Sequence, residues 1–371
     1  MTARSPFAGA VAALLAAAGL VTVSAESPPV TWRQITGPPA LHFPRDHGAH
    51  PDYRTEWWYL TGLVTAASGE RFGFQLTFFR QGLAPGPPED GSSRLRARQV
   101  LAAHLAVANI DRGRFLHAER LRRAGGGLAG FSVDDLHLWL DDWSLERRSD
   151  GLLAARARDV ERSVGLELEL QPIRELVRQG DAGYSRKGPD PGNASAYLSW
   201  TRLAVSGEIE ADGDRLQVRG TAWFDHEWGT SQLGEDVVGW DWFSLRLDDG
   251  RDLMVYRLRR ADGTADPYSS GTLVTAGGDV LRLGVADVAI EAAGRWTSPA
   301  SGGAYPSGWR LRVPDHGIDL EVRPLVEAAE VNGTRSTGVV YWEGPVAVSG
   351  STAGEGYVEL TGYAGSLEGR F

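Results

Sequence analysis

The chain has 371 residues, including 47 glycines, 13 tryptophans and no cysteine, and its formal net charge is −10. This length predicts two domains, and the lack of cysteine excludes a disulfide framework and lipidation of the N-terminal junction. Lys187 is the only lysine, and the arginines are scattered among acids, which argues against nucleic acid as a partner.

The first 25 residues have the pattern of a cleaved secretory signal peptide. Arg4 supplies the positive start, residues 7–23 are apolar, and Val23-Ser24-Ala25 is a small-residue cleavage site. An uncleaved membrane anchor is the alternative, but the apolar run is short and broken by glycine. We therefore expect a periplasmic or secreted protein with no membrane span after cleavage, in which residues 26–50 form an N-terminal extension.

From residue 51 onwards, short apolar runs alternate with polar residues and end at Gly, Asp or Pro. Residues 56–64 and 71–79 flank a Ser-Gly-Glu turn, which predicts a hairpin. Residues 96–110 are the one ambiguous stretch, and as a strand they place Leu101 and Leu105 opposite His104. The pattern predicts an all-β fold, with irregular loops at residues 81–93 and 180–195.

The two halves of the chain contain similar segments in the same order. Residues 203–207 read LAVSG and residues 346–350 read VAVSG, each after a Tyr and Trp pair. This order favours an internal duplication, and hence two β-barrels or curved sheets joined just after Gly229. We expect a first domain at residues 51–230 and a second at residues 231–371.

The heptapeptide WFDHEWG at residues 223–229 concentrates acids, indoles and an imidazole. If it continues a strand, Asp225 and Glu227 share one face, and His226 and Trp228 share the other. A carboxyl group among indoles has a raised pKa, and a buried imidazole can relay a proton. The alternative is a strand end whose carboxylates cap turn amides. A closed barrel with a deep apolar cavity would suit one small ligand.

Other chemistries have weaker support. His104, Asp225, His226 and Glu227 offer metal-ligand atoms, but the usual zinc spacings are absent. The chain has no Gly-x-Ser-x-Gly nucleophile motif and no glycine-rich phosphate loop between a strand and a helix. We therefore expect no metal and no cofactor.

Five segments together carry a resemblance to a known family: HPDYRTEWWYLTGLV, AAHLAVANID, GTAWFDHEWG, GWDWFSLRLDDGRDLMVYRLRRADG and YWEGPVAVSG with GYVELTGYA. They resemble the carotenoid 1,2-hydratases (hydroxyneurosporene synthases) and their secreted lipocalin-like relatives, which are often labelled predicted hydrolases. The resemblance covers residues 43–365. It implies two tandem lipocalin-like antiparallel β-barrels, an apolar isoprenoid or lipid-like ligand, and hydration of an isolated carbon–carbon double bond without a cofactor.

The resemblance also implies roles for particular residues. Protonation of an alkene requires a neutral acid in a dry pocket and aromatic faces that stabilise the carbocation. The family motif places Asp225, His226 and Trp228; either Asp225 or Glu56 is the acid, and His226 is its relay and the base that orients water. The segments around them add Glu56 and His104 as further catalytic candidates, and Trp57, Tyr59, Trp240 and Trp242 as further aromatic walls.

Residues 256–259 read YRLR and offer no acid in the second half, so a hydratase that relies on an acid there would differ from this chain. Two alternatives stay open. One is a non-catalytic carrier that passes its cargo to components of an envelope transporter, and the other is a secreted hydrolase.

Overall fold

A computed structural model describes residues 31–86, 97–230, 233–234 and 236–367. Residues 1–25, for which we predict a signal peptide, lie outside the described residues. The fold is all-β, as the alternating pattern predicts. Two short 3₁₀ turns accompany the described strands: η1 (Arg45–His47) precedes the first strand, and η2 (Pro314–His316) connects two later ones. No helix in the described part of the chain is long and apolar enough to cross a membrane.

Thirteen described strands form the first sheet, which is antiparallel throughout. They are β1 (Thr55–Ala66), β2 (Arg71–Gly82), β3 (Gln99–Asn109), β4 (Arg114–Arg123), β5 (Ala129–Phe131), β6 (His137–Leu140), β7 (Trp143–Arg147), β8 (Leu153–Asp159), β9 (Val164–Pro172), β10 (Val177–Arg178), β11 (Tyr184–Arg186), β12 (Ala194–Ala211) and β13 (Asp214–Gly229).

Ten described strands form the second sheet, and two more form a small separate ribbon. The second sheet contains β14 (Val237–Leu247), β15 (Asp252–Arg260), β16 (Ser270–Val274), β17 (Val280–Gly284), β18 (Ala289–Ala292), β21 (Trp309–Val313), β22 (Ile318–Pro324), β23 (Glu330–Gly333), β24 (Val339–Gly350) and β25 (Gly354–Leu360), and the ribbon contains β19 (Trp296–Thr297) and β20 (Ala304–Tyr305).

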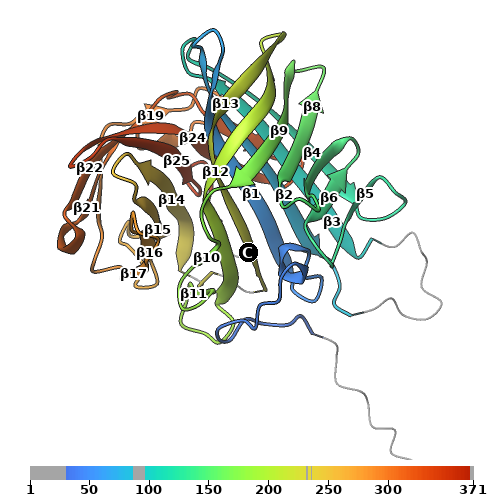
Figure 1. Cartoon of the computed structure of the whole chain (residues 1–371). Coiled ribbons are helices and arrows are strands. Elements are labelled where there is room, and N and C mark those ends of the chain that lie inside the picture. Colours follow the sequence, from blue (N-terminus) through green and yellow to red (C-terminus); the bar gives the residue numbers. More distant parts are fainter. Residues whose placement is uncertain (1–30, 87–96, 231–232, 235, 368–371) are drawn as a thin grey trace, which may run out of the picture. The chain divides into compact units, whose positions relative to one another are not determined.

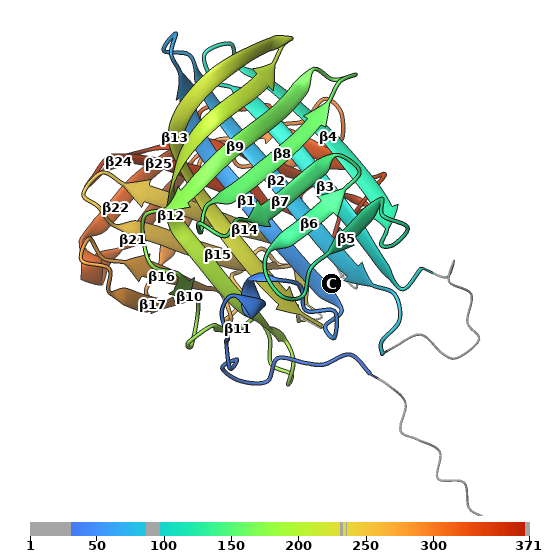
Figure 2. The ribbon, with the colours of Figure 1, turned by 45° about the vertical axis from the view of Figure 1, so that its right-hand side comes forward.

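The first sheet curls into a nearly closed barrel, with the strand order β4-β3-β2-β1-β13-β12-β9-β8-β7-β6-β5 (Figures 1 and 2). Its two edges approach each other through Arg120 of β4, which bonds the carbonyl oxygen of Leu140 at the end of β6 at 3.4 Å. Closure reduces the number of unpaired edge strands, which would otherwise invite pairing with other chains.

The interior of this barrel is a solid apolar core. Alternate residues of β1 and β2, such as Trp58, Leu60, Phe74 and Leu76, point inward and are completely buried. The stretch at residues 96–110 is a strand, β3, and its Leu101 side joins this core. Large side chains therefore pack the interior of the barrel over its described strands.

The second sheet is a curled half-barrel with the order β17-β16-β15-β14-β25-β24-β22-β21-β18. Figure 1 shows it, coloured from yellow to red, beside the blue-to-green first sheet. One face of it buries a separate core that includes Phe243, Leu311 and Trp342. The sequence therefore predicted the two-sheet all-β architecture correctly.

The outer face of the first sheet packs against the second sheet. Gly73 of β2 lies so close that an added Cβ would meet the ring of Pro345 at 2.7 Å and the hydroxyl oxygen of Tyr357 at 2.6 Å. A third apolar cluster, including Tyr59 and Trp223 from the first sheet and Trp242 from the second, fills much of this junction. The strands of the first sheet end at Gly229, and those of the second begin at Val237.

Candidate functional site

A cavity of about 510 Å³ opens where the two sheets meet. Residues of β1, β2, β3 and β13 line one side, and residues of β14, β15, β24 and β25 line the other. The expectation of a ligand space inside a closed barrel is therefore wrong for the first sheet, because that interior is packed with large side chains. The two sheets share one cavity between them.

Aromatic side chains from both sheets line the cavity. They are Trp57, Tyr59, Phe79 and Tyr197 from the first sheet, and Trp240, Trp242, Tyr256 and Tyr341 from the second. Four of the five predicted aromatic wall residues, Trp57, Tyr59, Trp240 and Trp242, therefore line the cavity. A concave, mostly aromatic space with a few polar groups is typical of small-molecule sites.

Asp225 of β13 points into this cavity and is 3% exposed. Its carboxylate accepts hydrogen bonds from the Tyr197 hydroxyl at 2.7 Å, the Ser199 hydroxyl at 2.5 Å and the Trp223 indole at 2.6 Å. Burial raises its pKa to about 7, although these three bonds favour the ionised form. Asp225 can therefore exchange a proton near neutral pH.

Two further carboxyl groups face each other across the second sheet. Glu343 of β24 is directly opposite Glu359 of β25 in the strand register. Burial raises the pKa of Glu359 to about 8 and raises the pKa of Glu343 well above its usual value, and the neighbouring carboxylate adds to the shift of Glu343. Two neighbouring carboxyl groups that are shielded from water repel each other when both are ionised, so at least one of Glu343 and Glu359 holds a proton.

Glu343 is also unsatisfied. Both of its carboxylate oxygens are buried and make no hydrogen bond within the described residues, and the hydroxyl of Tyr59 is in the same state. Tyr59, Gln75 and Tyr341 lie close enough to the carboxyl group to oppose the rise of its pKa, although none of them makes a hydrogen bond of normal geometry with it among the described residues. Buried polar groups are normally paired, so these oxygens are available to a ligand or to water in the cavity.

Lys187 brings a positive charge to the cavity from the segment after β11. Its ammonium forms an ion pair with Glu227, which also accepts a hydrogen bond from the Ser195 hydroxyl. The ammonium nitrogen lies 5.3 Å from the ring centre of Tyr197 and 5.2 Å from that of Tyr256. Residues 180–195, expected to be an irregular loop, thus contain a short strand and a cavity residue.

His104 lies on the cavity side of β3, as the strand alternation predicts. Its Nδ1 is 2.8 Å from the Tyr341 hydroxyl and its Nε2 is 2.8 Å from the Ser336 hydroxyl. Burial lowers its pKa to about 3, so the imidazole is neutral. It is bonded to hydroxyl groups of the second sheet and makes no hydrogen bond to Asp225, Glu343 or Glu359 among the described side chains.

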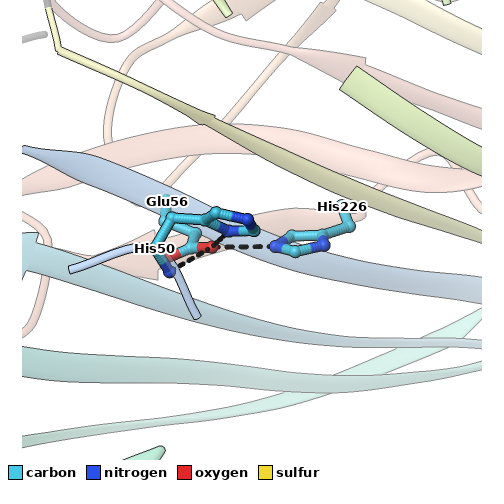
Figure 3. Close-up of side chains that lie close together, drawn as sticks. All are labelled: His50, Glu56 and His226. Atoms are coloured by element: carbon cyan, nitrogen blue, oxygen red, sulfur yellow. Dashed lines mark hydrogen bonds and ion pairs between the residues drawn. The ribbon is translucent and has the colours of Figure 1, made fainter. Parts of the chain in front are cut away.

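His226 and Trp228 lie on the opposite face of β13, away from the cavity. The strand runs without interruption through WFDHEWG, so the alternation expected for its side chains holds. His226 bonds Glu56 through Nε2 at 2.9 Å (Figure 3). Its ring also stacks on Trp58. The structure therefore does not place His226 as a proton relay for Asp225, and Trp228 is not a cavity wall.

The carboxylate of Glu56 is the centre of this second polar cluster, shown in Figure 3. It accepts bonds from His50 Nδ1 at 2.8 Å and from Arg80 Nε at 2.7 Å, in addition to His226. Burial alone would raise the pKa of Glu56, but Arg80 and the two imidazoles hold it well below its usual value. Glu56 is ionised, so it does not meet the requirement for a neutral acid.

The same three residues, His50, Glu56 and His226, bring ligand atoms within 4.8 Å of one another, which is close enough for a metal ion. The burial that lowers the pKa of His226 to about 4 keeps its imidazole neutral, as metal ligation requires. However, the Arg80 guanidinium already neutralises Glu56 at 2.7 Å, and a cation there would be repelled by it. The donor set fits an internal ion-pair network better than a metal centre.

Among the cavity residues that the sequence analysis missed, three carry ionisable groups that the site uses. Glu343 follows Trp342 in an acid–indole pair, Glu359 lies in the alternating run YVEL, and Lys187 is the only lysine of the chain. Strand alternation shows that Glu359 and Tyr357 share a face, but it does not show which strands pair. The cross-strand approach of Glu343 and Glu359 depends on the hairpin register of β24 and β25.

The fold and site define a class of all-β protein in which two large antiparallel sheets enclose an aromatic cavity between them. A family model described as AttH-like matches residues 34–363, and the chain belongs to the AttH-like family. The sequence motifs indicated a resemblance to the carotenoid hydratases. The family model supports membership of the broader AttH-like family and does not assign the chain to the hydratases.

Solved structures support the fold. A Nitrosomonas europaea protein named as a candidate AttH is 36% identical with a TM-score of 0.79, and the match covers 88% of this chain and 98% of that one. Kievitone hydratase from Nectria haematococca is 14% identical with a TM-score of 0.67, covering 91% of this chain and 97% of that one, and supports the fold alone. No curated protein matches the sequence.

Proposed function

We propose that this protein binds an apolar isoprenoid or lipid-like molecule in the cavity between the sheets and adds water to one of its carbon–carbon double bonds. The observation that carries the proposal is the set of three carboxyl groups at the cavity, Asp225, Glu343 and Glu359, whose pKa values are raised by burial among aromatic walls. We further propose that the protein is exported, on the strength of its N-terminal sequence.

The roles divide according to the surroundings of each carboxyl. The Glu343–Glu359 pair retains a proton and has no cationic partner among the described residues, so it is the better acid. Asp225 accepts three hydrogen bonds and has a pKa of about 7, so it is the better base. This assignment replaces the expected pairing of Asp225 with His226.

In the proposed reaction, the carboxyl pair gives its proton to one alkene carbon, and the π electrons form the new C–H bond. The neighbouring carbon becomes a cation, which the aromatic faces stabilise. The oxygen of a water molecule then bonds to this carbon, and the water's surplus proton passes to Asp225. Exchange with solvent after product release restores the starting protonation, and the net change is the addition of one water.

The test uses the purified mature protein with kievitone or an acyclic carotenoid as trial substrates in water enriched in heavy oxygen. We expect a hydrated product that carries the heavy isotope. General acid catalysis contributes about 10²–10⁴-fold, so the doubly substituted variant Glu343→Gln, Glu359→Gln should lose activity by about that factor. Glu321→Gln is the matched control, because Glu321 lies at an exposed position of β22, where it forms an ion pair with Arg323.

Unchanged turnover in the double variant would show that the proton comes from another group. The carrier alternative makes a different prediction: an apolar molecule would be extracted from the protein after purification, and no trial substrate would be hydrated. A hydrolase would release two fragments from an ester probe, and substitution of the cavity carboxyls would be the first test of that activity as well.

A further inference from the structure

Two of the ion pairs near the cavity are complete. Arg80 neutralises Glu56 on the barrel side of β1 at 2.7 Å, and Lys187 neutralises Glu227 on the cavity side. Arg80 and Lys187 are the basic residues of the described chain, histidine aside, that lie along the cavity, and both are already paired. The imidazole of His104 is neutral and adds no positive charge.

Three carboxyl groups are left without an ion-pair partner among the described residues: Asp225, Glu343 and Glu359. Asp225 is satisfied by three neutral donors, but both oxygens of Glu343 are buried without a hydrogen bond. Glu359 lies directly opposite Glu343 and is partly accessible along the cavity. The floor of the cavity on the second sheet therefore carries unpaired acidic groups.

The cavity walls already accommodate one ammonium group. The Lys187 nitrogen lies 5.9, 5.3 and 5.2 Å from the ring centres of Trp57, Tyr197 and Tyr256, respectively. Aromatic faces at these distances attract cations, and desolvation strengthens the attraction. The remaining wall, which includes Tyr59, Trp240 and Tyr341, offers the same kind of surface beside the unpaired carboxyls.

We propose that the cavity is a binding site for organic cations, namely a tertiary or quaternary ammonium group attached to an apolar tail. The ammonium lies against the Glu343–Glu359 pair, and the tail lies along the aromatic walls. The inference relies on the proposed function only for the location of the site. An ammonium group carries the same positive charge as the carbocation of the proposed hydration. Its binding can nevertheless be measured without any catalytic turnover.

The experiment is calorimetric titration of the full mature protein with three probes of equal chain length: decyltrimethylammonium, 1-decanol and decanoate. We expect decyltrimethylammonium to bind at least about tenfold more tightly than decanol, because the Glu343–Glu359 pair attracts its positive charge in addition to the attraction of the aromatic faces. Decanoate should bind most weakly, because the faces of the aromatic rings do not attract an anion and the acidic pair, which a bound cation would help to ionise, offers a carboxylate no opposite charge.

The double variant Glu343→Gln, Glu359→Gln should lose the preference for the ammonium probe and retain its affinity for decanol. Retained decanol binding shows that the variant is folded, so a lost preference is not a loss of structure. The control Glu321→Gln should bind all three probes as the wild type does.

Equal affinity for decanol and decyltrimethylammonium in the wild type would overturn the proposal, and so would an unchanged preference in the double variant. Tightest binding of decanoate would also overturn it and would assign the charge preference to Lys187. These outcomes are separable from hydration, because a protein can hydrate an alkene without preferring the ammonium probe, and can bind the probe without turnover.

Discussion

Glu56 and His226 are 170 positions apart in the chain, yet the Oε1 atom of Glu56 lies 2.9 Å from the Nε2 atom of His226. Both side chains are about 1% exposed. The contact joins β1 to β13, which are neighbours in the first sheet with Glu56 opposite Trp228 and Trp57 opposite Glu227. Glu56 also holds Arg80 and His50, so one carboxylate organises a buried network.

We predict that Glu56→Gln strongly destabilises the fold. The substitution leaves the buried Arg80 guanidinium without its counter-charge, and loss of one partner of a buried ion pair costs about 3–5 kcal/mol. The measurement is the free energy of unfolding by urea at neutral pH. Glu169→Gln is the control, because Glu169 pairs with Arg148 at an exposed position, where the expected effect is below about 1 kcal/mol.

The difference in unfolding free energy between the wild type and Glu56→Gln should also depend on pH, and the direction of that dependence follows from the pKa of Glu56. The pKa of Glu56 is lowered in the folded state, so its stabilising contribution is present above its ordinary value of 4.5 and is lost as the pH falls through the folded-state pKa. The difference between wild type and Glu56→Gln should therefore narrow in acid. A difference that grows in acid would contradict the assignment of an ionised Glu56.

The contribution of Asp225 to stability should depend on pH in the opposite direction to that of Glu56. Its folded-state pKa is about 7 against an ordinary 3.8, so the folded state holds the proton more tightly, and ionisation of Asp225 destabilises the fold as the pH rises from about 4 to about 7. Asp225→Asn should therefore gain stability relative to the wild type between pH 4 and 8, on the order of 4 kcal/mol.

Unfolding of both proteins across this pH range measures the effect, and Asp134→Asn at an exposed position should show no such trend. If the stability difference between Asp225→Asn and the wild type does not change with pH, Asp225 is ionised throughout, and its assignment as a proton-exchanging group fails.

Two neighbouring alanines test where the free space lies. Ala102 and Ala103 both belong to β3, but Ala102 lines the cavity and Ala103 is buried in the barrel core. Ala102→Phe should fill the cavity, abolish binding of 1-decanol and change the unfolding free energy little. Ala103→Phe should overpack the core and cost about 1–3 kcal/mol or more.

Titration calorimetry and thermal unfolding of the two variants give the comparison. Should Ala102→Phe bind decanol as the wild type does, the ligand space is not between the sheets.

The ion pair of Lys187 and Glu227 gives a fourth prediction. Lys187→Met leaves the Glu227 carboxylate buried without a cation and should cost about 3–5 kcal/mol. The double variant Lys187→Met, Glu227→Gln removes the charge as well and should recover much of that loss. Urea unfolding of both variants supplies the measurement, and equal losses in the single and double variants would show that Lys187 acts through packing alone.

Strand periodicity was sufficient to predict the all-β fold and the two faces of WFDHEWG. The alternation that separates Asp225 and Glu227 from His226 and Trp228 is a local property of one strand, and the structure retains it. The same property correctly gave the side of β3 on which His104 lies. These predictions needed no knowledge of which strands are neighbours.

The location of the cavity could not be predicted in this way. It depends on the packing of the first sheet against the second, where Gly73 allows the backbone of β2 to approach Pro345 and Tyr357 closely. The pairing of Glu343 with Glu359 depends on hairpin register, and the approach of Lys187 depends on the path of a loop. Because His226 follows Asp225 in the sequence, we expected it to relay protons to Asp225. Adjacent side chains of a strand point in opposite directions, however, so the two groups lie on different faces of β13.

The two faces of strand β13 lie in chemically different surroundings. On one side Asp225 faces a hollow space, and on the other His226 is locked into a packed ionic network. Insertion of a single residue before Asp225 would reverse the two sides, placing an imidazole in the hollow and an unpaired carboxylate in the core. A substitution at Asp225 therefore changes the chemistry of the cavity alone, whereas a change of length before it changes both faces of the strand at once.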